Sequence, residues 1–104
     1  DLRKIALDLP QLKLIVAHGA WHGVEKVLND LQNVYFDFSN SHPEKGMIEN
    51  LGRVVSHKQF LFGTDVNLID PSYIVGLYRD SGFDEAQLKN IMYGNAKELF
   101  QLKV

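Results

Sequence analysis

Phe60-Leu-Phe-Gly-Thr-Asp65 is the stretch that decides the fold of this chain. A short apolar, aromatic-rich run passes directly into a glycine, a hydroxyl and a carboxylate. Such a run is typical of a buried strand in a parallel sheet that is followed by a loop. Asp65 then stands at the carboxyl end of the strand, where open α/β sheets and βα-barrels place their chemistry.

Two earlier strand-like runs end in the same way. Residues 12–17 form an apolar run that ends at His18, and residues 34–38 form one that ends at Ser39. Because the carboxyl ends of parallel strands lie at one edge of a sheet, we expect His18, Ser39 and Asp65 to converge. This convergence is the main functional indication in the sequence.

Helical patterns connect the three predicted strands. Residues 21–31 and 47–55 carry apolar side chains at helical spacing. Ser41 predicts an N-cap for the second of these helices, with Glu44 at the capping-box position. Each connection is long enough for one crossover helix, and right-handed crossovers give a parallel sheet. The predicted fold class is therefore α/β with a parallel sheet.

The residues after the third strand are predicted to be helical. Asp70, followed by proline, predicts one helix start, and Asp84 predicts another. Gly94-Asn95 predicts a break before a last helix, in which we expect Phe100 and Leu102 to be buried.

The composition is that of a folded globular domain. The 104 residues are 45% hydrophobic and 23% charged, with a formal net charge of -2. The chain lacks the basic footprint of a nucleic-acid-binding protein, and no apolar run approaches the roughly 20 residues needed to span a bilayer. The absence of cysteine excludes disulfides and thiolate metal sites. It makes a cytoplasmic location the default.

The chain opens at Asp1, without methionine, in the middle of a helical pattern that stops at Pro10. We therefore expect residues 1–104 to be the C-terminal part of a single larger domain. A processed small domain is the alternative. The sequence does not predict an oligomeric state.

Asp65 is the first candidate for chemistry. A carboxylate after Gly-Thr at a strand end can bind a metal, accept a proton or cap the next helix. The next helix begins too late for Asp65 to cap it, and Asp70 is better placed for that role. Gly63 allows close approach of another group.

His18 is the second candidate. An imidazole at a strand end suits a metal ligand, a proton carrier or an electrophile. The simpler alternative is a histidine bonded to a backbone carbonyl at the sheet edge. Together, His18 and Asp65 predict a site for metal-assisted hydrolysis with a general base. His22 lies four residues after His18, but the pair straddles the strand end and the turn and should not share the helical face of a zinc clamp. Trp21 and His22 are therefore expected to form pocket wall or to contact substrate.

Four segments, in their order and spacing, resemble the C-terminal part of the metal-dependent amidohydrolase superfamily: Leu14-Ile-Val-Ala-His-Gly19, Asn33-Val-Tyr-Phe-Asp-Phe-Ser39, Phe60-Leu-Phe-Gly-Thr-Asp65 and Ile91-Met-Tyr-Gly-Asn-Ala-Lys-Glu-Leu-Phe100. They are most similar to the amidohydrolase-related branch that includes the aminocarboxymuconate semialdehyde decarboxylase-like enzymes. The resemblance covers nearly the whole chain. It implies a (β/α)8 TIM barrel, of which this chain supplies the last three strands and their helices as an incomplete barrel.

The resemblance also implies roles for individual residues. Asp65 matches the aspartate at the end of the last barrel strand, which contacts the metal or its water and moves protons. His18 matches the sixth-strand histidine, which binds a metal or orients the nucleophile and the substrate carbonyl. The implied cofactor is a divalent ion, zinc in the first place, with manganese or another ion as an alternative. Tyr93–Phe100 matches the closing helix and would be structural.

The chain departs from the family by lacking the His-x-His pair of the first strand and the ligand from the middle strands. His18 and Asp65 supply at most two ligands, whereas a catalytic zinc site typically has three. The expected activity, hydrolysis of an amide, ester or lactone, therefore belongs to the full-length parent, and this piece alone should be inactive. A metal-dependent decarboxylase and a non-catalytic α/β ligand-binding module are the alternatives. The expected partner is a small-molecule substrate, without nucleic acid or membrane.

Overall fold

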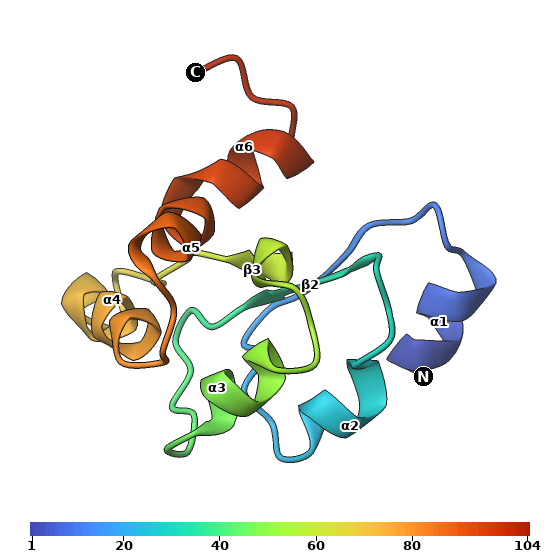
Figure 1. The fold of residues 1–104 in the computed structure, drawn as a ribbon, viewed down its shortest axis with the longest axis horizontal. Coiled ribbons are helices and arrows are strands. Elements are labelled where there is room, and N and C mark those ends of the chain that lie inside the picture. Colours follow the sequence, from blue (N-terminus) through green and yellow to red (C-terminus); the bar gives the residue numbers. More distant parts are fainter.

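Short helices surround a three-stranded sheet (Figure 1). The structure, a computed structural model, describes residues 1–104. The strands are β1 (Leu14–Val16), β2 (Val34–Asp37) and β3 (Phe60–Leu61). The helices are α1 (Leu2–Asp8), α2 (Val24–Leu28), α3 (Met47–Gly52), α4 (Pro71–Arg79), α5 (Glu85–Lys89) and α6 (Asn95–Leu99). A 3-10 turn, His57–Gln59, precedes β3, and a π-helical stretch, Asn90–Gly94, joins α5 to α6.

The three strands run parallel in the order β1-β2-β3, which confirms the predicted α/β class. Val16 of β1 lies opposite Phe36 of β2, and Phe36 lies opposite Phe60 of β3. The crossovers contain α2 and α3, as the helical patterns predict. The carboxyl ends of all three strands therefore lie at one edge of the sheet, and the loops that follow them share that edge.

Alternation along β2 separates the two faces of the sheet. Val34, Phe36 and Phe38 are fully buried in the main apolar core, while Tyr35 and Asp37, which point to the other face, are half-buried. Helices α2 and α3 lie together on one side of the strands (Figure 1). The second face is the more open one.

An aromatic cluster connects the sheet to the C-terminal helices. The ring centroids of Phe60 and Phe83 lie 5.4 Å apart, and those of Phe38 and Tyr78 lie 6.0 Å apart. The Tyr78 hydroxyl donates a hydrogen bond of 2.8 Å to the carbonyl of Leu61 in β3. Burial raises the pKa of Tyr78 above its ordinary value, and the nearby negative charge of Asp37 raises it further. α4 is thereby fixed against the end of β3.

Buried amides hold the amino ends of the strands. The Gln59 amide donates to the carbonyls of Leu31 and Val34, both at 2.7 Å. The Asn95 amide donates to two carbonyls in the segment 57–60, both at 2.8 Å. These bonds satisfy backbone acceptors where the strands begin, so this end of the sheet serves stability.

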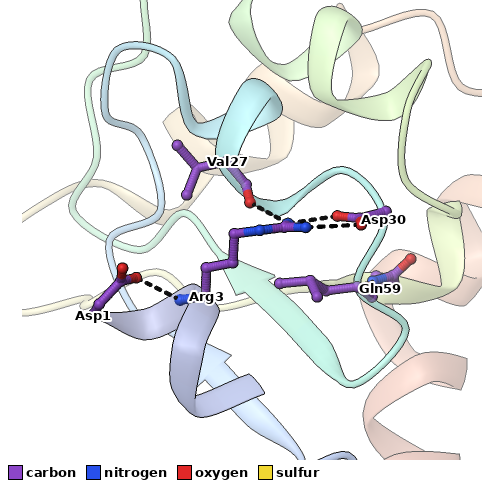
Figure 2. A network of polar contacts seen from close by, with 6 residues as sticks. Asp1, Arg3, Val27, Asp30 and Gln59 are labelled. Carbon is purple, nitrogen blue, oxygen red and sulfur yellow. Dashed lines mark hydrogen bonds and ion pairs between the residues drawn. The ribbon is translucent and has the colours of Figure 1, made fainter. Parts of the chain in front are cut away.

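Arg3 attaches the first helix to the rest of the chain (Figure 2). Its guanidinium donates to both carboxylate oxygens of Asp30, at 2.6 and 2.9 Å, and to the carbonyl of Val27 at 2.8 Å. The hydrogen bond from Arg3 lowers the pKa of Asp30. Asp1 caps α1 by accepting a hydrogen bond from the Arg3 amide at 3.0 Å.

Two predictions about local structure are wrong. Ser41 does not cap α3, because Gly46 takes the N-cap position and the Ser41 hydroxyl donates to the carbonyl of Ser39 at 3.2 Å. Gly94 does not break the last helix, because the π-helical stretch leads directly into α6.

The predicted burial at the chain end is also wrong. Phe100 and Leu102 are 55% and 46% exposed, since they follow α6 and no element of this chain packs over them. None of the helices is both long enough and apolar enough to cross a lipid bilayer.

Candidate functional site

The three loops at the carboxyl edge of the sheet share an unusual backbone feature. Each contains one non-glycine residue with positive φ: His18 after β1 at 54°, Asn40 after β2 at 46° and Asp65 after β3 at 59°. Elsewhere in the chain only Gln101 does the same among non-glycine residues. The left-handed conformation costs L-residues roughly 1–2 kcal/mol, although Asn and Asp tolerate it better. Because such strain concentrates at functional sites, this edge is the natural place for one.

His18 has a defined ring orientation. Its Nδ1 lies 2.5 Å from the carbonyl oxygen of Ser39. A carbonyl can only accept, so Nδ1 carries a proton, and in the neutral ring Nε2 then keeps its lone pair. Nε2 makes no hydrogen bond within the chain, and His18 is exposed. His18 and Ser39 lie together as predicted, but the contact is to the backbone carbonyl of Ser39, which is the bond that the simpler alternative for His18 predicts.

Asp37, which the sequence reasoning missed, organises the loop that His18 contacts. Its Oδ1 accepts from the Ser39 amide at 2.8 Å, and its Oδ2 accepts from the Ser39 hydroxyl at 2.9 Å. The indication in the sequence was the alternation of β2: Phe36 and Phe38 belong to the core, so a charge between them must face the other side.

Asp65 lies in the loop after β3, with an exposed side chain. Its backbone carbonyl accepts from the amides of Leu68 and Ile69 at 2.8 and 3.3 Å. Asp70 caps α4 by accepting from the Ser72 amide at 2.9 Å, which confirms that Asp65 is not needed as a cap. The Asp65 carboxylate forms no hydrogen bond within the chain and no ion pair with His18 within 4.0 Å. The structure therefore places both residues in loops at one edge without joining them directly.

Gly63 allows the close approach that the sequence predicts. A Cβ at this position would lie 2.8 Å from Oδ1 of Asp37. Any larger residue would displace that carboxylate or the strand end. Gly63, in the loop after β3, therefore makes room for the Asp37 carboxylate at the end of β2.

Trp21 and His22 lie in the segment between β1 and α2, in the same connection as His18. Both side chains are exposed. Their contact with a substrate stays a prediction.

The donor chemistry of this edge suits a divalent ion, but the donor set is incomplete. A histidine whose one ring nitrogen is bonded to a backbone carbonyl while the other is free has the arrangement of a metal ligand. His18 has this arrangement, and Asp65 offers an unengaged carboxylate. No group of three histidine, aspartate or glutamate side chains comes close enough to hold an ion. Two donors from this chain fall short of the three that catalytic zinc sites use.

Comparison with protein families identifies the chain, because the amidohydrolase family model matches residues 1–102. The chain belongs to the amidohydrolase family. No curated protein matches it.

The amidohydrolase chain is also similar to a solved structure, that of an uncharacterized TIM-barrel protein from Bordetella bronchiseptica. The TM-score is 0.77 at 19% sequence identity, with 96% of this chain and 38% of that chain covered. This likeness shows the fold alone, and it confirms the predicted partial barrel. The chain thus spans well under half of the length of the barrel protein that it matches.

Proposed function

We propose that this chain forms part of the active site of a metal-dependent hydrolase that acts on a small carbonyl compound, an amide, ester or lactone. Membership of the amidohydrolase family supports this reaction class. The observation that carries the proposal is the bond from His18 Nδ1 to the Ser39 carbonyl, since it leaves Nε2 free at the edge that also presents Asp65.

His18 and Asp65 would hold the ion, together with ligands from outside this chain. A divalent cation at such a site activates water and polarises a carbonyl. Zinc is the first expectation and manganese an alternative, because a mixed imidazole and carboxylate donor set suits both.

The residues of the chain have separate roles in this proposal. Asp65, as general base, takes the proton from the attacking water, and its exposed position lets it return that proton to the leaving group. His18 presents Nε2 to the ion or, once protonated, to the substrate carbonyl. Trp21 and His22 would contact the substrate beside it.

The test uses the full-length gene product, loaded with zinc or manganese and assayed against a panel of simple amides, esters and lactones. We expect Asp65→Asn and His18→Ala each to lower kcat by about 100-fold or more, the range typical of a lost acid–base group. Asp80→Asn is the matched control, because Asp80 is exposed, lies after α4 and makes no side-chain hydrogen bond. Full turnover by both site variants would refute the roles proposed for His18 and Asp65.

Product analysis separates the hydrolase from the decarboxylase of the same superfamily. A hydrolase consumes water and releases an acid with an amine or alcohol, whereas a decarboxylase releases carbon dioxide without net hydrolysis. We expect the first outcome. Carbon dioxide release that is lost in Asp65→Asn would show that the protein is a decarboxylase and not a hydrolase. Absence of turnover, with ligand binding that Asp65→Asn does not weaken, would favour a non-catalytic module.

A further inference from the structure

A chain of hydrogen bonds links Asp37 through Ser39 to His18 at the carboxyl ends of the strands. The Asp37 carboxylate receives two hydrogen bonds from Ser39, one from its amide at 2.8 Å and one from its hydroxyl at 2.9 Å. The Ser39 carbonyl in turn accepts the Nδ1 proton of His18 at 2.5 Å. Ser39, in the middle of this relay of contacts, is only 8% exposed, whereas Asp37 is half-buried and His18 is exposed.

The two bonds to Asp37 fix the direction of the Ser39 carbonyl. One bond holds the backbone of Ser39 and the other holds its side chain, so rotation of this residue would break both. Asn40, the next residue, has the left-handed φ of 46° that turns the loop away. An acceptor held in this way offers the imidazole one tautomer and one ring orientation.

The loop after β3 lies against the Asp37 carboxylate. Gly63 leaves space that the Asp37 carboxylate occupies, because a Cβ there would lie 2.8 Å from Oδ1. The Gly19 amide, next to His18, donates to the Asp37 carbonyl at 2.8 Å and ties the first loop to β2. The loop after β1 therefore contributes the imidazole, the end of β2 contributes the carboxylate with the serine that follows it, and the loop after β3 contributes the space.

We propose that Asp37 is a positioning residue which, through Ser39, holds the His18 ring with Nδ1 protonated and Nε2 free for a ligand. This inference rests on the proposed function, in which Nε2 of His18 binds the ion or the substrate. Asp37 itself is assigned no contact with metal or substrate. Its two hydrogen bonds remove the freedom that would otherwise let His18 rotate or exchange tautomers.

Four variants probe the relay at different points. Asp37→Ala removes both bonds to Ser39. Asp37→Asn keeps an oxygen for one of them and should restore part of the effect. Ser39→Ala removes only the hydroxyl bond, and Gly63→Ala pushes on the carboxylate without removing any polar group.

The first measurement is the tautomer of His18, read from the ¹⁵N shifts of its ring nitrogens. The full-length gene product is used, stripped of metal, at about pH 8, which is above the ordinary pKa of histidine. In the wild-type protein we expect the Nδ1–H form to predominate. In Asp37→Ala and Gly63→Ala we expect a mixture of tautomers, with a smaller change in Asp37→Asn and none in the Asp80→Asn control.

The second measurement is kcat in the metal-loaded protein. We expect Asp37→Ala to lower kcat by about 10- to 100-fold, as is typical when the partner of a ligand histidine is removed, while KM changes little.

The tautomer measurement does not depend on any activity, so it still decides the positioning role if the hydrolase proposal fails. Retention of the Nδ1–H tautomer in folded Asp37→Ala or Gly63→Ala protein would overturn this inference. If Asp37→Ala does not fold, Ser39→Ala and Gly63→Ala decide it by the same two measurements.

Discussion

At the scale of single residues, the local chemistry of caps and turns is what the sequence predicts best. Asp70 and Asp84 cap their helices as predicted, since a carboxylate just before a helical run bonds the free amides whatever lies around it. Ser41 does not act as a cap because α3 begins only at Met47, too far along the chain for the Ser41 hydroxyl to accept from the first amides of the helix. Asp37 escapes sequence reasoning because its role depends on a contact between distant parts of the chain. Its partner Ser39 is near in sequence, but the His18 ring that Ser39 contacts is far away in sequence.

The left-handed backbone of Asp65 gives a prediction about stability. Because φ is 59° and glycine adopts this conformation without strain, Asp65→Gly should be more stable than Asp65→Ala by about 1 kcal/mol. Urea denaturation of the two variants measures the difference. Equal stability, or a more stable alanine variant, would show that the loop is not held in this conformation.

Tyr78 gives a prediction about alkaline pH. Its pKa is raised by burial above the ordinary value of 10.0, so above that pH the unfolded chain loses this proton while the folded chain keeps it. The free energy of unfolding should therefore fall by about 1.4 kcal/mol per pH unit from this group above roughly pH 10. Below that pH the contribution is fully present. Denaturation between about pH 8 and pH 11 should show a shallower decline in Tyr78→Phe. Identical slopes in both proteins would contradict the assignment.

At the scale of elements, order and direction are predictable and boundaries are not. The three apolar runs form three parallel strands, but β1 is shorter than residues 12–17 suggest, and β3 is shorter than the apolar run that begins at Phe60 and ends before Gly63. Hydrophobic pattern shows where a strand can lie, whereas pairing with a neighbour decides where it ends. Gly94-Asn95 suggests a break because glycine usually ends helices. Asn95 instead turns inward within a continuous helical segment.

Asn95 therefore supports a prediction about how α6 is attached. Its buried amide donates to the carbonyls of His57 and Phe60, so Asn95→Ala should lower the free energy of unfolding by about 2–3 kcal/mol. Urea denaturation of the variant measures this loss. Asn90→Ala is the control, because the Asn90 amide makes one longer contact of 3.3 Å to His57. A loss no larger than in the control would mean that the amide does not carry this attachment.

At the scale of the whole molecule, the sheet has two open edges. β1 and β3 each pair with β2 only, whereas a closed barrel leaves no strand edge free. Ile15 of β1 is 43% exposed on the more open face. The number of strands could be read from the sequence. A full set of metal ligands could not be read from it, since no three histidine, aspartate or glutamate side chains of this chain gather at one point.

The open edge predicts self-association of the isolated 104-residue chain. An unpaired, apolar edge strand is a template for pairing with another chain, and a lysine on it opposes that pairing. We expect Ile15→Lys to raise the dissociation constant for self-association about 10-fold, a change of roughly 1.4 kcal/mol, as measured by sedimentation velocity. Val104→Lys, at the exposed chain end, should have no effect. Association that is equally strong in both variants would place the contact elsewhere.

The central claim is that His18 and Asp65 serve one ion. Anomalous diffraction from crystals of the full-length gene product, grown with zinc and recorded at the zinc edge, tests it most directly. We predict a peak about 2.0–2.2 Å from His18 Nε2 and from a carboxylate oxygen of Asp65. A fully occupied zinc peak that touches neither residue, or the absence of any bound zinc, would contradict the claim.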